Sequence, residues 1–383
     1  MTADTATDRR PKRPLPALIV AFVVSLIVGL VVLTIVNAGL ALIWDKIPGA
    51  WTSTPAWYVI AVMVVAGVLV YLVRTFVGDH GHSPLDGLGI HPLTPKEYVG
   101  AILAIVATLW GGIVLGPEVA LISTGTMIGG VMARAFKIND AKATKNLLSV
   151  GALGAILALL VAPILAGTAM LDQTPKTIEY SQLWWAIVVA AIATVAVTIA
   201  RIVGAGFAHL AGGKPHLIAL VVSALIIAAS ALVMQYITGE NVLFVATSGE
   251  EMISDLPAIT SASTVAAILL FKTIAYGASL GSGYRGGPFF PAMFVGAATG
   301  LLIALLLPGV VSVQAAIVVG VVASLIATAK MSWKVAIVLG IIVGAVMGSW
   351  TLIPAAVVAA IVARLIPRWG DKVTQRYASA AMA

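Results

Sequence analysis

The chain has 383 residues, of which 61% are hydrophobic and only 10% are charged. Soluble domains carry about 25% charged residues, so this composition, with a mean hydropathy of +1.08, excludes a soluble protein and indicates a polytopic membrane protein. The net charge of +7 does not predict a nucleic-acid partner, because the Lys and Arg residues lie in tails and connections between apolar runs, where they set orientation. The absence of cysteine excludes disulfides and thiolate metal sites.

Apolar runs long enough to cross a bilayer core of about 30 Å recur along the whole chain. We therefore predict an all-α polytopic membrane protein, in which Gly and Pro interrupt several helices. Interrupted helices at membrane depth require backbone groups that are buried in protein or line a wet cavity, so the interruptions indicate a functional site. In chain order, the expected helices cover residues 17–43, 57–77, 98–115, 118–136, 147–171, 182–208, 216–237, 262–280, 289–307, 311–329, 333–349 and 351–366.

Basic residues cluster in three places, at residues 9–13, 134–145 and 364–376. The positive-inside bias predicts that all three clusters face the cytoplasm, with both termini there and the protein in the inner (plasma) membrane. The expected domain organisation is a cytoplasmic basic tail at 1–16, a first membrane repeat at 17–174, a linker at 175–181, a second membrane repeat at 182–366 and a cytoplasmic tail at 367–383.

A lone carboxylate, Glu118, lies inside a long apolar stretch, directly after Gly116 and Pro117. A charge in hydrocarbon costs roughly 3 kcal/mol on insertion scales, so such a residue usually marks a conduction path or a proton relay. The alternatives are a helix boundary that leaves Glu118 in a loop, or a protonated glutamate with only a packing role.

Two interruptions resemble each other and fall in comparable places of the two halves. Gly116-Pro117-Glu118 precedes one helix and Gly287-Pro288-Phe289 precedes another. Corresponding broken segments predict an inverted-repeat transporter with its site at the membrane midplane. Helix N-termini that meet there present free N–H groups and about half a positive charge each, which favours an anion. The alternative is ordinary packing of Gly-rich helices.

These segments resemble motifs of the CLC family of chloride channels and chloride/proton exchangers, over most of residues 80–366. Residues 116–125 are similar to the family's GREGP motif and its Gly-rich helix, and Gly287-Pro288-Phe289-Phe290-Pro291 matches GxFxP completely. The run 272–283 resembles the segment that precedes GxFxP. The resemblance implies a CLC-like inverted repeat of broken and tilted transmembrane helices, a homodimer with one pore per subunit, and transport of a small inorganic anion, with chloride as the first expectation.

The resemblance also implies a role for each residue of these motifs. Glu118 takes the gating position: a charged carboxylate competes with the anion for N–H groups, and protonation lets it leave the pore. Ser83 is either a hydroxyl donor to the central site or a helix cap. The predicted anion-binding residues are Gly116, Val119, Ala120, Phe289, Phe290 and Ser83, and the further motif residues are Pro117, Gly287, Pro288 and Pro291.

The chain also departs from the family pattern. Pro117 and Pro288 occupy positions that supply N–H donors in relatives, and proline has none. The family's pore tyrosine aligns with Ala356, and its inner proton-accepting glutamate aligns with Gln173, with Asp172 as the only nearby acid. The sequence therefore leaves open whether transport is passive or coupled to protons.

Two function hypotheses remain: a CLC-type anion pathway, or a secondary transporter of another small ion or solute on the same inverted-repeat fold. We expect no enzyme activity, because the spans lack a nucleophile–base pair and a metal cluster. No cofactor, metal or nucleic acid is expected; the expected partners are the anion, protons and the lipid bilayer. Lys272 is interpreted as raising the local positive potential or extending to a membrane interface. The acids of the 238–255 connection, including Glu250, are interpreted as solvated.

Overall fold

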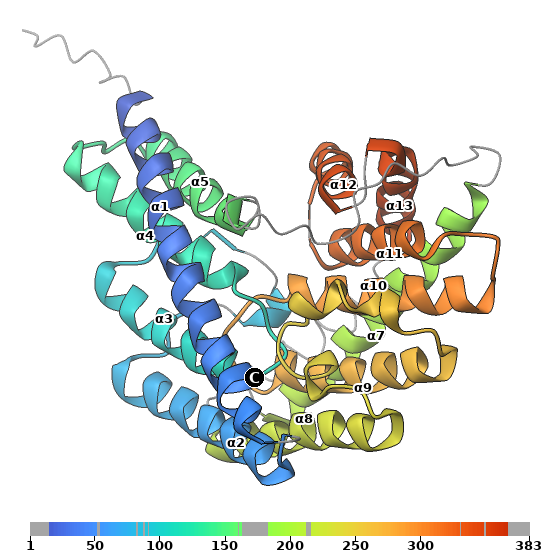
Figure 1. Ribbon diagram of the computed structural model, residues 1–383. Coiled ribbons are helices and arrows are strands. Elements are labelled where there is room, and N and C mark those ends of the chain that lie inside the picture. The colour runs from blue at the N-terminus through green and yellow to red at the C-terminus, as the bar shows by residue number, and fades with distance from the viewer. Residues whose placement is uncertain are drawn as a thin grey trace, which may run out of the picture.

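The helices of the computed structural model form two groups, α1–α5 and α7–α13, which lie on different sides of the molecule (Figure 1). The structure describes residues 15–51, 54–81, 83–86, 89–90, 92–159, 161–162, 183–211, 216–329, 331–347 and 350–366. The helices are α1 Leu15–Leu40, α2 Ala56–Leu72, α3 Pro95–Trp110, α4 Glu118–Ala135, α5 Ala141–Ile156, α7 Trp184–Ala211, α8 Leu217–Thr238, α9 Ala262–Gly281, α10 Phe289–Leu306, α11 Val313–Thr328, α12 Trp333–Met347 and α13 Ile353–Leu365.

Short helical turns extend or connect these helices. Two π-helical turns prolong α1 and α2, and short 3₁₀ turns lie in the connections. The π turns are η1 Ala41–Lys46 and η3 Val73–Val77, and the 3₁₀ turns are η2 Pro48–Ala50, η4 Pro84–Asp86, η6 Val242–Phe244, η7 Glu251–Ile253, η8 Leu256–Ala258 and η9 Trp350–Leu352.

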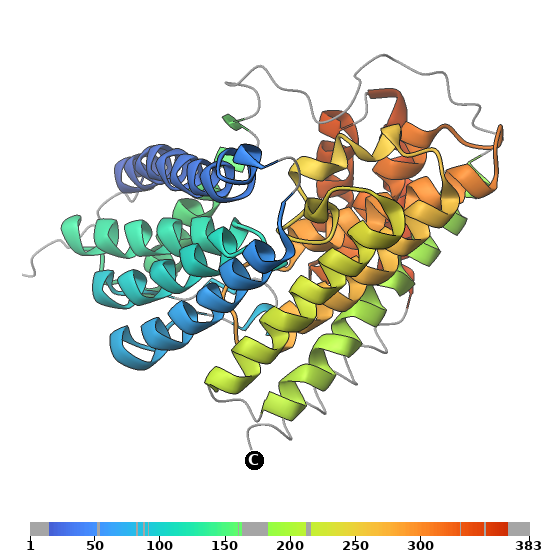
Figure 2. The same cartoon turned by 60° about the horizontal axis from the view of Figure 1, so that its bottom comes forward.

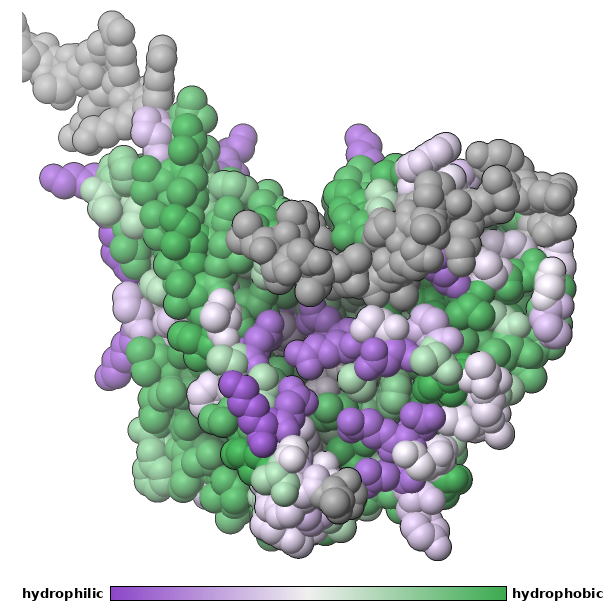
Figure 3. Space-filling view, viewed as in Figure 1, coloured by the Kyte–Doolittle hydropathy of each residue, from purple (hydrophilic) through white to green (hydrophobic). Residues whose placement is uncertain are grey.

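The prediction of an all-α polytopic membrane protein is confirmed in the described part of the chain. Six stretches there, Leu15–Ala50, Ala56–Val77 and the whole of α7, α8, α9 and α10, are long and apolar enough to cross a membrane. Large apolar side chains are exposed along the outward faces of these helices, as at Ile19 and Ile218. Figure 3 shows hydrophobic residues over the helix group of α1 to α3, and hydrophilic residues gathered toward the middle of the same face. Such an exposed apolar surface suits lipid rather than water.

The two helix groups are built alike. Helix α4 packs along α5, and α10 along α11, while α1 and α7 each pack across one of these pairs. A Cβ atom at Gly125 would collide with the carbonyl of Gly151, and one at Gly296 would collide with the carbonyl of Gly320. Gly125 lies in α4 and Gly296 lies in α10, at the same distance from the start of each helix. The two groups therefore have equivalent close contacts between their paired helices.

Helices α4 and α10 begin near each other and run apart into their own groups (Figure 2). Helices α2 and α8 pack together and join the groups along a second line. This arrangement brings the two Gly/Pro turns that precede α4 and α10 to the centre of the molecule.

Two helix boundaries differ from the sequence expectation. The helix expected at 98–115 ends at Trp110, because Gly112 adopts a positive φ of +73° and turns the chain. The helix expected at 147–171 already begins at Ala141, because Asp140 caps it by accepting a hydrogen bond from the Ala143 N–H. The rest of that expected helix, with Asp172 and Gln173, lies outside the described residues, as do the expected tail and linker segments 1–14, 175–181 and 367–383.

The equivalent glycine contacts give a test of the fold. Gly296→Ala should lower the unfolding free energy by about 1–3 kcal/mol, because the added methyl group meets the backbone of α11. Gly206→Ala in α7 is the matched control, since a Cβ there meets nothing within 4 Å, and it should keep or slightly raise stability. Thermal unfolding of the detergent-solubilised protein measures both, and equal midpoints for the two variants would contradict the packing described.

Candidate functional site

Two backbone hydrogen bonds join the turns that precede α4 and α10. The N–H of Gly116 donates to the Gly287 carbonyl at 2.7 Å, and the N–H of Gly287 donates to the Gly116 carbonyl at 2.7 Å. The pair forms an isolated antiparallel bridge. The N-cap residues of the two helices, Pro117 and Pro288, directly follow the bridged glycines, so the bridge fixes the two helix N-termini against each other.

Proline limits the number of free donors at the start of α10. The first four N–H groups of a helix have no intrahelical partner. In α10 these positions are Pro288, Phe289, Phe290 and Pro291, and proline carries no N–H. Phe289 and Phe290 are therefore the two backbone donors of this N-terminus, where the helix dipole also favours a negative charge.

The carboxylate of Glu118 takes both donors. Its Oε1 atom accepts hydrogen bonds from the N–H groups of Phe289 and Phe290, at 2.5 and 3.2 Å. The side chain is 1% exposed, and its Oε2 atom is buried with no hydrogen-bond partner among the described residues. A Cβ atom at Gly116 or Gly287 would collide with this carboxylate, so both glycines are needed for the close approach.

Two polar side chains of α9 hold the turns on either side of the carboxylate. The Tyr276 hydroxyl donates to the Pro288 carbonyl at 2.5 Å. The Ser279 hydroxyl accepts a hydrogen bond from the Val114 N–H at 3.1 Å. Both side chains are fully buried. Their spacing of three residues places them on one face of α9, and this pair of polar residues in an apolar run is the sequence signal by which they could have been found.

Lys272 has a structural role and does not extend to an interface, as one interpretation of the sequence had it. Its side chain is fully buried. Its Nζ atom donates to the carbonyls of Val245, Ala246 and Thr247, each at 3.1 Å, and lies 4.7 Å from the centre of the Phe294 ring. Lys272 therefore fastens the connection between α8 and α9 to the protein interior.

The same connection is bound to the turn that follows α3. The Thr247 N–H donates to the Gly112 carbonyl at 2.8 Å. Between the connection, α1 and α4 lies a cavity of about 300 Å³. Its polar lining includes the carboxylates of Asp45, Glu250 and Glu251, and its wall includes Pro117, the residue before Glu118.

The interpretation of Glu250 as a solvated loop residue is wrong. Glu250 is partly buried and lies in the cavity wall. Burial, followed by the nearby negative charges of Glu118 and Glu251, raises the pKa of Glu250 to about 8. A carboxyl group with this pKa changes its charge near neutral pH.

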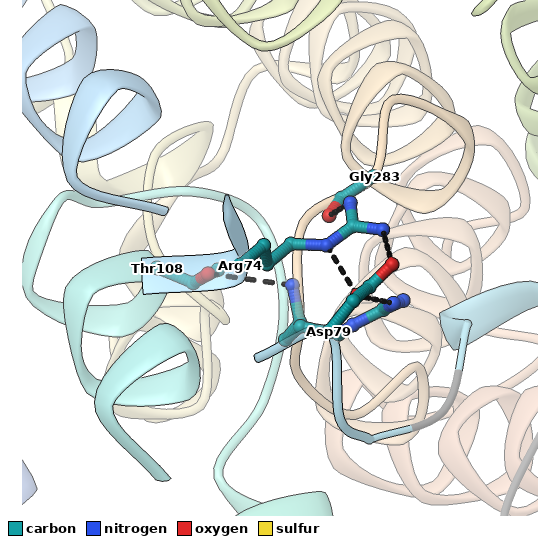
Figure 4. Close-up of polar contacts among 5 residues, drawn as sticks. Arg74, Asp79, Thr108 and Gly283 are labelled. Atoms are coloured by element: carbon teal, nitrogen blue, oxygen red, sulfur yellow. Dashed lines mark hydrogen bonds and ion pairs between the residues drawn. The ribbon is translucent and has the colours of Figure 1, made fainter. Parts of the chain in front are cut away.

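A second charged cluster lies at the other end of α2 from Asp45. Arg74 Nε and Nη2 donate to the two carboxylate oxygens of Asp79 at 2.6 and 2.7 Å, and Arg285 Nη2 donates to Asp79 at 2.6 Å. Arg74 Nη1 also donates to the Gly283 carbonyl at 2.6 Å (Figure 4). The Arg285 N–H donates to the Thr108 hydroxyl at 3.4 Å. The cluster therefore joins the end of α2 to the segment that leads into α10.

Asp79 is ionised over the whole physiological range. Partial burial acts to raise the pKa of its carboxyl group, but the hydrogen bonds and charges of Arg74 and Arg285 outweigh burial and lower that pKa to about 2. The cluster is not visible in the sequence, because its two arginines stand more than 200 residues apart in the chain.

The structure places the remaining predicted residues near the start of α4 or in other elements. Val119 and Ala120 are buried in the first turn of α4, whose N–H groups are also free of intrahelical partners. Ser83 is partly buried before η4, which packs on α7 and α9. Ala356, at the expected tyrosine position, is buried in α13 against Gly344 of α12. Within the described residues, no group of three or more His, Asp or Glu side chains could hold a metal ion.

The fold and the paired helix N-termini define an inverted-repeat membrane transporter. A family model described as voltage gated chloride channel matches residues 153–368, which is more than half of the 383 residues. The chain belongs to this family, the CLC proteins.

Curated relatives cover most of the chain. The ion-transport homologue YfeO of Escherichia coli strain UMN026 is 26% identical over an alignment of 344 residues, and the match covers 77% of this chain and 80% of that protein. YfeO of Escherichia fergusonii is 25% identical over 352 residues, with the same coverage of 77% and 80%.

Solved structures share the fold. A slow cyanobacterial Cl⁻/H⁺ antiporter superposes with a TM-score of 0.73 at 17% identity, and covers 97% of this chain and 99% of its own. A CLC-type fluoride/proton antiporter superposes with a TM-score of 0.68 at 13% identity, with coverage of 92% and 95%. The CLC-like arrangement of broken helices expected from the sequence is thereby confirmed.

The Asp79 cluster gives a test by stability. Asp79→Asn should lower the unfolding free energy by about 1–3 kcal/mol, because two largely buried guanidinium groups lose their shared carboxylate. This range is smaller than for a fully buried pair, since the Asp79 side chain is 40% exposed. The lowered pKa gives a stabilisation that is complete above the unfolded-state pKa of about 3.9 and is lost as pH falls toward 2.

Thermal unfolding in detergent at neutral pH and at pH values below 4 measures this effect. The exposed Asp255→Asn variant is the control. Equal unfolding midpoints for Asp79→Asn and the control at neutral pH would show that the cluster contributes nothing to stability.

Proposed function

We propose that the protein transports a small inorganic anion, chloride in the first place, across the inner (plasma) membrane through a CLC-type pore gated by Glu118. One observation carries this proposal: the Glu118 carboxylate accepts both free N–H groups of the α10 N-terminus. A carboxylate oxygen held in this way occupies a place suited to an anion. The proposal also rests on family membership and on the solved relatives described as Cl⁻/H⁺ and fluoride/proton antiporters.

The gate acts by competition for two hydrogen-bond donors. Hydrogen bonds to a charged group contribute about 1.5–3 kcal/mol each, so the ionised carboxylate of Glu118 stays on Phe289 and Phe290 and keeps the anion out. Protonation neutralises the carboxylate and weakens both hydrogen bonds. The side chain then leaves, and an anion takes its place at the positive end of α10. Gly116, Val119 and Ala120 supply the opposing wall from the start of α4.

Two departures from the family pattern affect the expected coupling of anion transport to protons. Ala356 offers no hydroxyl at the expected tyrosine position, and the two prolines reduce the number of donors. We therefore propose that the anion site has fewer hydrogen-bond donors than the family pattern provides. We also propose that anion transport still responds to protons through Glu118. Whether protons are carried through the membrane depends on the segment that contains Asp172 and Gln173.

Orientation and assembly follow from the charge pattern and the family resemblance. Both termini are proposed to face the cytoplasm, because the basic clusters lie in the tails and after α4. In this orientation α1 runs outward, so the cavity lined by Asp45 and Glu250 lies on the external side. The protein is proposed to be a homodimer with one pore in each subunit, surrounded by lipid.

The gate is tested by anion efflux from liposomes that contain the purified protein. Wild-type flux should rise as external pH falls, because protonation releases Glu118 from Phe289 and Phe290. Glu118→Gln mimics the neutral side chain, so its anion flux should persist and lose its pH dependence. The Asp255→Asn variant is the control for charge removal elsewhere and should behave as wild type.

Two outcomes would contradict the proposal. Unchanged pH dependence in Glu118→Gln would exclude Glu118 as the gate. Cation flux without anion flux would exclude an anion pathway and favour a transporter of another ion on the same fold.

A further inference from the structure

We infer that Glu250 is the residue through which Glu118 exchanges protons with the external solution, by way of the cavity that the α8–α9 connection encloses. This inference rests on the proposed gating role of Glu118. It assigns a defined function to a connection that carries no part of the family motifs.

Glu250 is held in place by its own segment. The connection that contains it is fastened by Lys272 at three carbonyls and by the bond from Thr247 to Gly112. Gly249 has a positive φ of +82°, and a Cβ atom there would lie 2.9 Å from Lys272 Nζ. Gly249 therefore packs closely against the buried Lys272, and Glu250 itself is the N-cap of η7.

The cavity extends from Glu250 to the residue next to the gate. Its lining includes Glu250 and Pro117, and Pro117 is bonded directly to Glu118. A volume of about 300 Å³ has room for several water molecules. Water in this cavity can carry a proton from Glu250 to the start of α4, next to Glu118.

One carboxylate oxygen of Glu118 is available to accept a proton. Oε1 is occupied by the N–H groups of Phe289 and Phe290, whereas Oε2 is buried with no hydrogen-bond partner among the described residues. A Cβ atom at Gly116 would have Oε2 as its nearest neighbour, so this oxygen lies beside the residue that precedes the cavity wall. Oε2 is therefore the atom to which a proton can be added while the two N–H bonds still hold.

The charges that face Glu250 favour such a transfer. Glu118 and Glu251 both repel its negative charge, and Asp45 of η1 lines the same cavity. The amine of Lys272, which lies near the connection, is directed at backbone carbonyls. Neighbouring carboxylates that repel each other share protons and titrate as a coupled group.

The test measures external-pH dependence of anion flux in liposomes, with internal pH held constant. Glu250→Gln should require about tenfold more external protons for half-maximal flux, because Glu118 loses the carboxyl group that passes protons to it from the cavity. Glu250→Asp keeps a carboxylate and should largely restore the wild-type response. The neighbouring Glu251→Gln variant is the matched control and should shift the response less than Glu250→Gln.

A double variant distinguishes proton transfer from Glu250 to Glu118 from a general effect of removing a charge. In a Glu118→Gln background, Glu250→Gln should change nothing, because the proton acceptor is already absent. Maximal flux at saturating acid and the elution profile in detergent show that each variant folds. A change of internal pH should affect wild type and Glu250→Gln equally.

Three results would overturn the inference. A wild-type external response in Glu250→Gln, with the response lost in Glu118→Gln, would exclude the relay and leave the gate intact. An equal shift by Glu250→Gln with and without Glu118 would show that the effect does not pass through the gate. A Glu118→Gln protein that keeps its external response would refute the proposed function itself, and the inference with it.

Discussion

The hydrogen bonds from the Phe289 and Phe290 N–H groups to the Glu118 carboxylate are the interaction on which the site depends. They are possible because the Gly116–Gly287 bridge sets two helix N-termini against each other, and because neither glycine has a Cβ to collide with the carboxylate. Proline at two of the four N-terminal positions of α10 leaves those two donors alone to bind a negative charge. A carboxylate and an anion cannot both occupy them.

Several side chains of the surrounding helices fix the positions of the two turns that precede α4 and α10. Tyr276 and Ser279 of α9 bind the two turns, and the Asp79 cluster ties the end of α2 to the segment that leads into α10. Lys272 fixes the α8–α9 connection, which lines the cavity next to Pro117. Two charged regions, near Asp79 and near Glu250, therefore lie at different ends of α2, and the carboxylate of Glu118 lies in the apolar protein between the helix groups.

The sequence predicted the parts of the site whose chemistry is local. Glu118, the two Gly/Pro turns and the helix pattern follow from neighbouring residues, and a charge inside an apolar run is visible without a fold. The surroundings of Lys272 and Glu250 were not predictable, because their neighbours come from other segments of the chain or are backbone carbonyls. The start of α5 was missed because Lys142 and Lys145 resemble a basic connection, although the Asp140 cap places them in a helix. The paired contacts at Gly125 and Gly296 needed the three-dimensional packing.

Bromide binding to crystals of the protein tests whether Glu118 and an anion compete for the two donors, because bromide can replace chloride and its anomalous scattering locates it. In Glu118→Gln crystals we expect a bromide peak within hydrogen-bond distance of the Phe289 and Phe290 nitrogens. In wild-type crystals at neutral pH we expect the carboxylate at the same place and no bromide there. Bromide at these two nitrogens beside an undisplaced Glu118 carboxylate, or no bromide there in the variant, would contradict competition for the two donors.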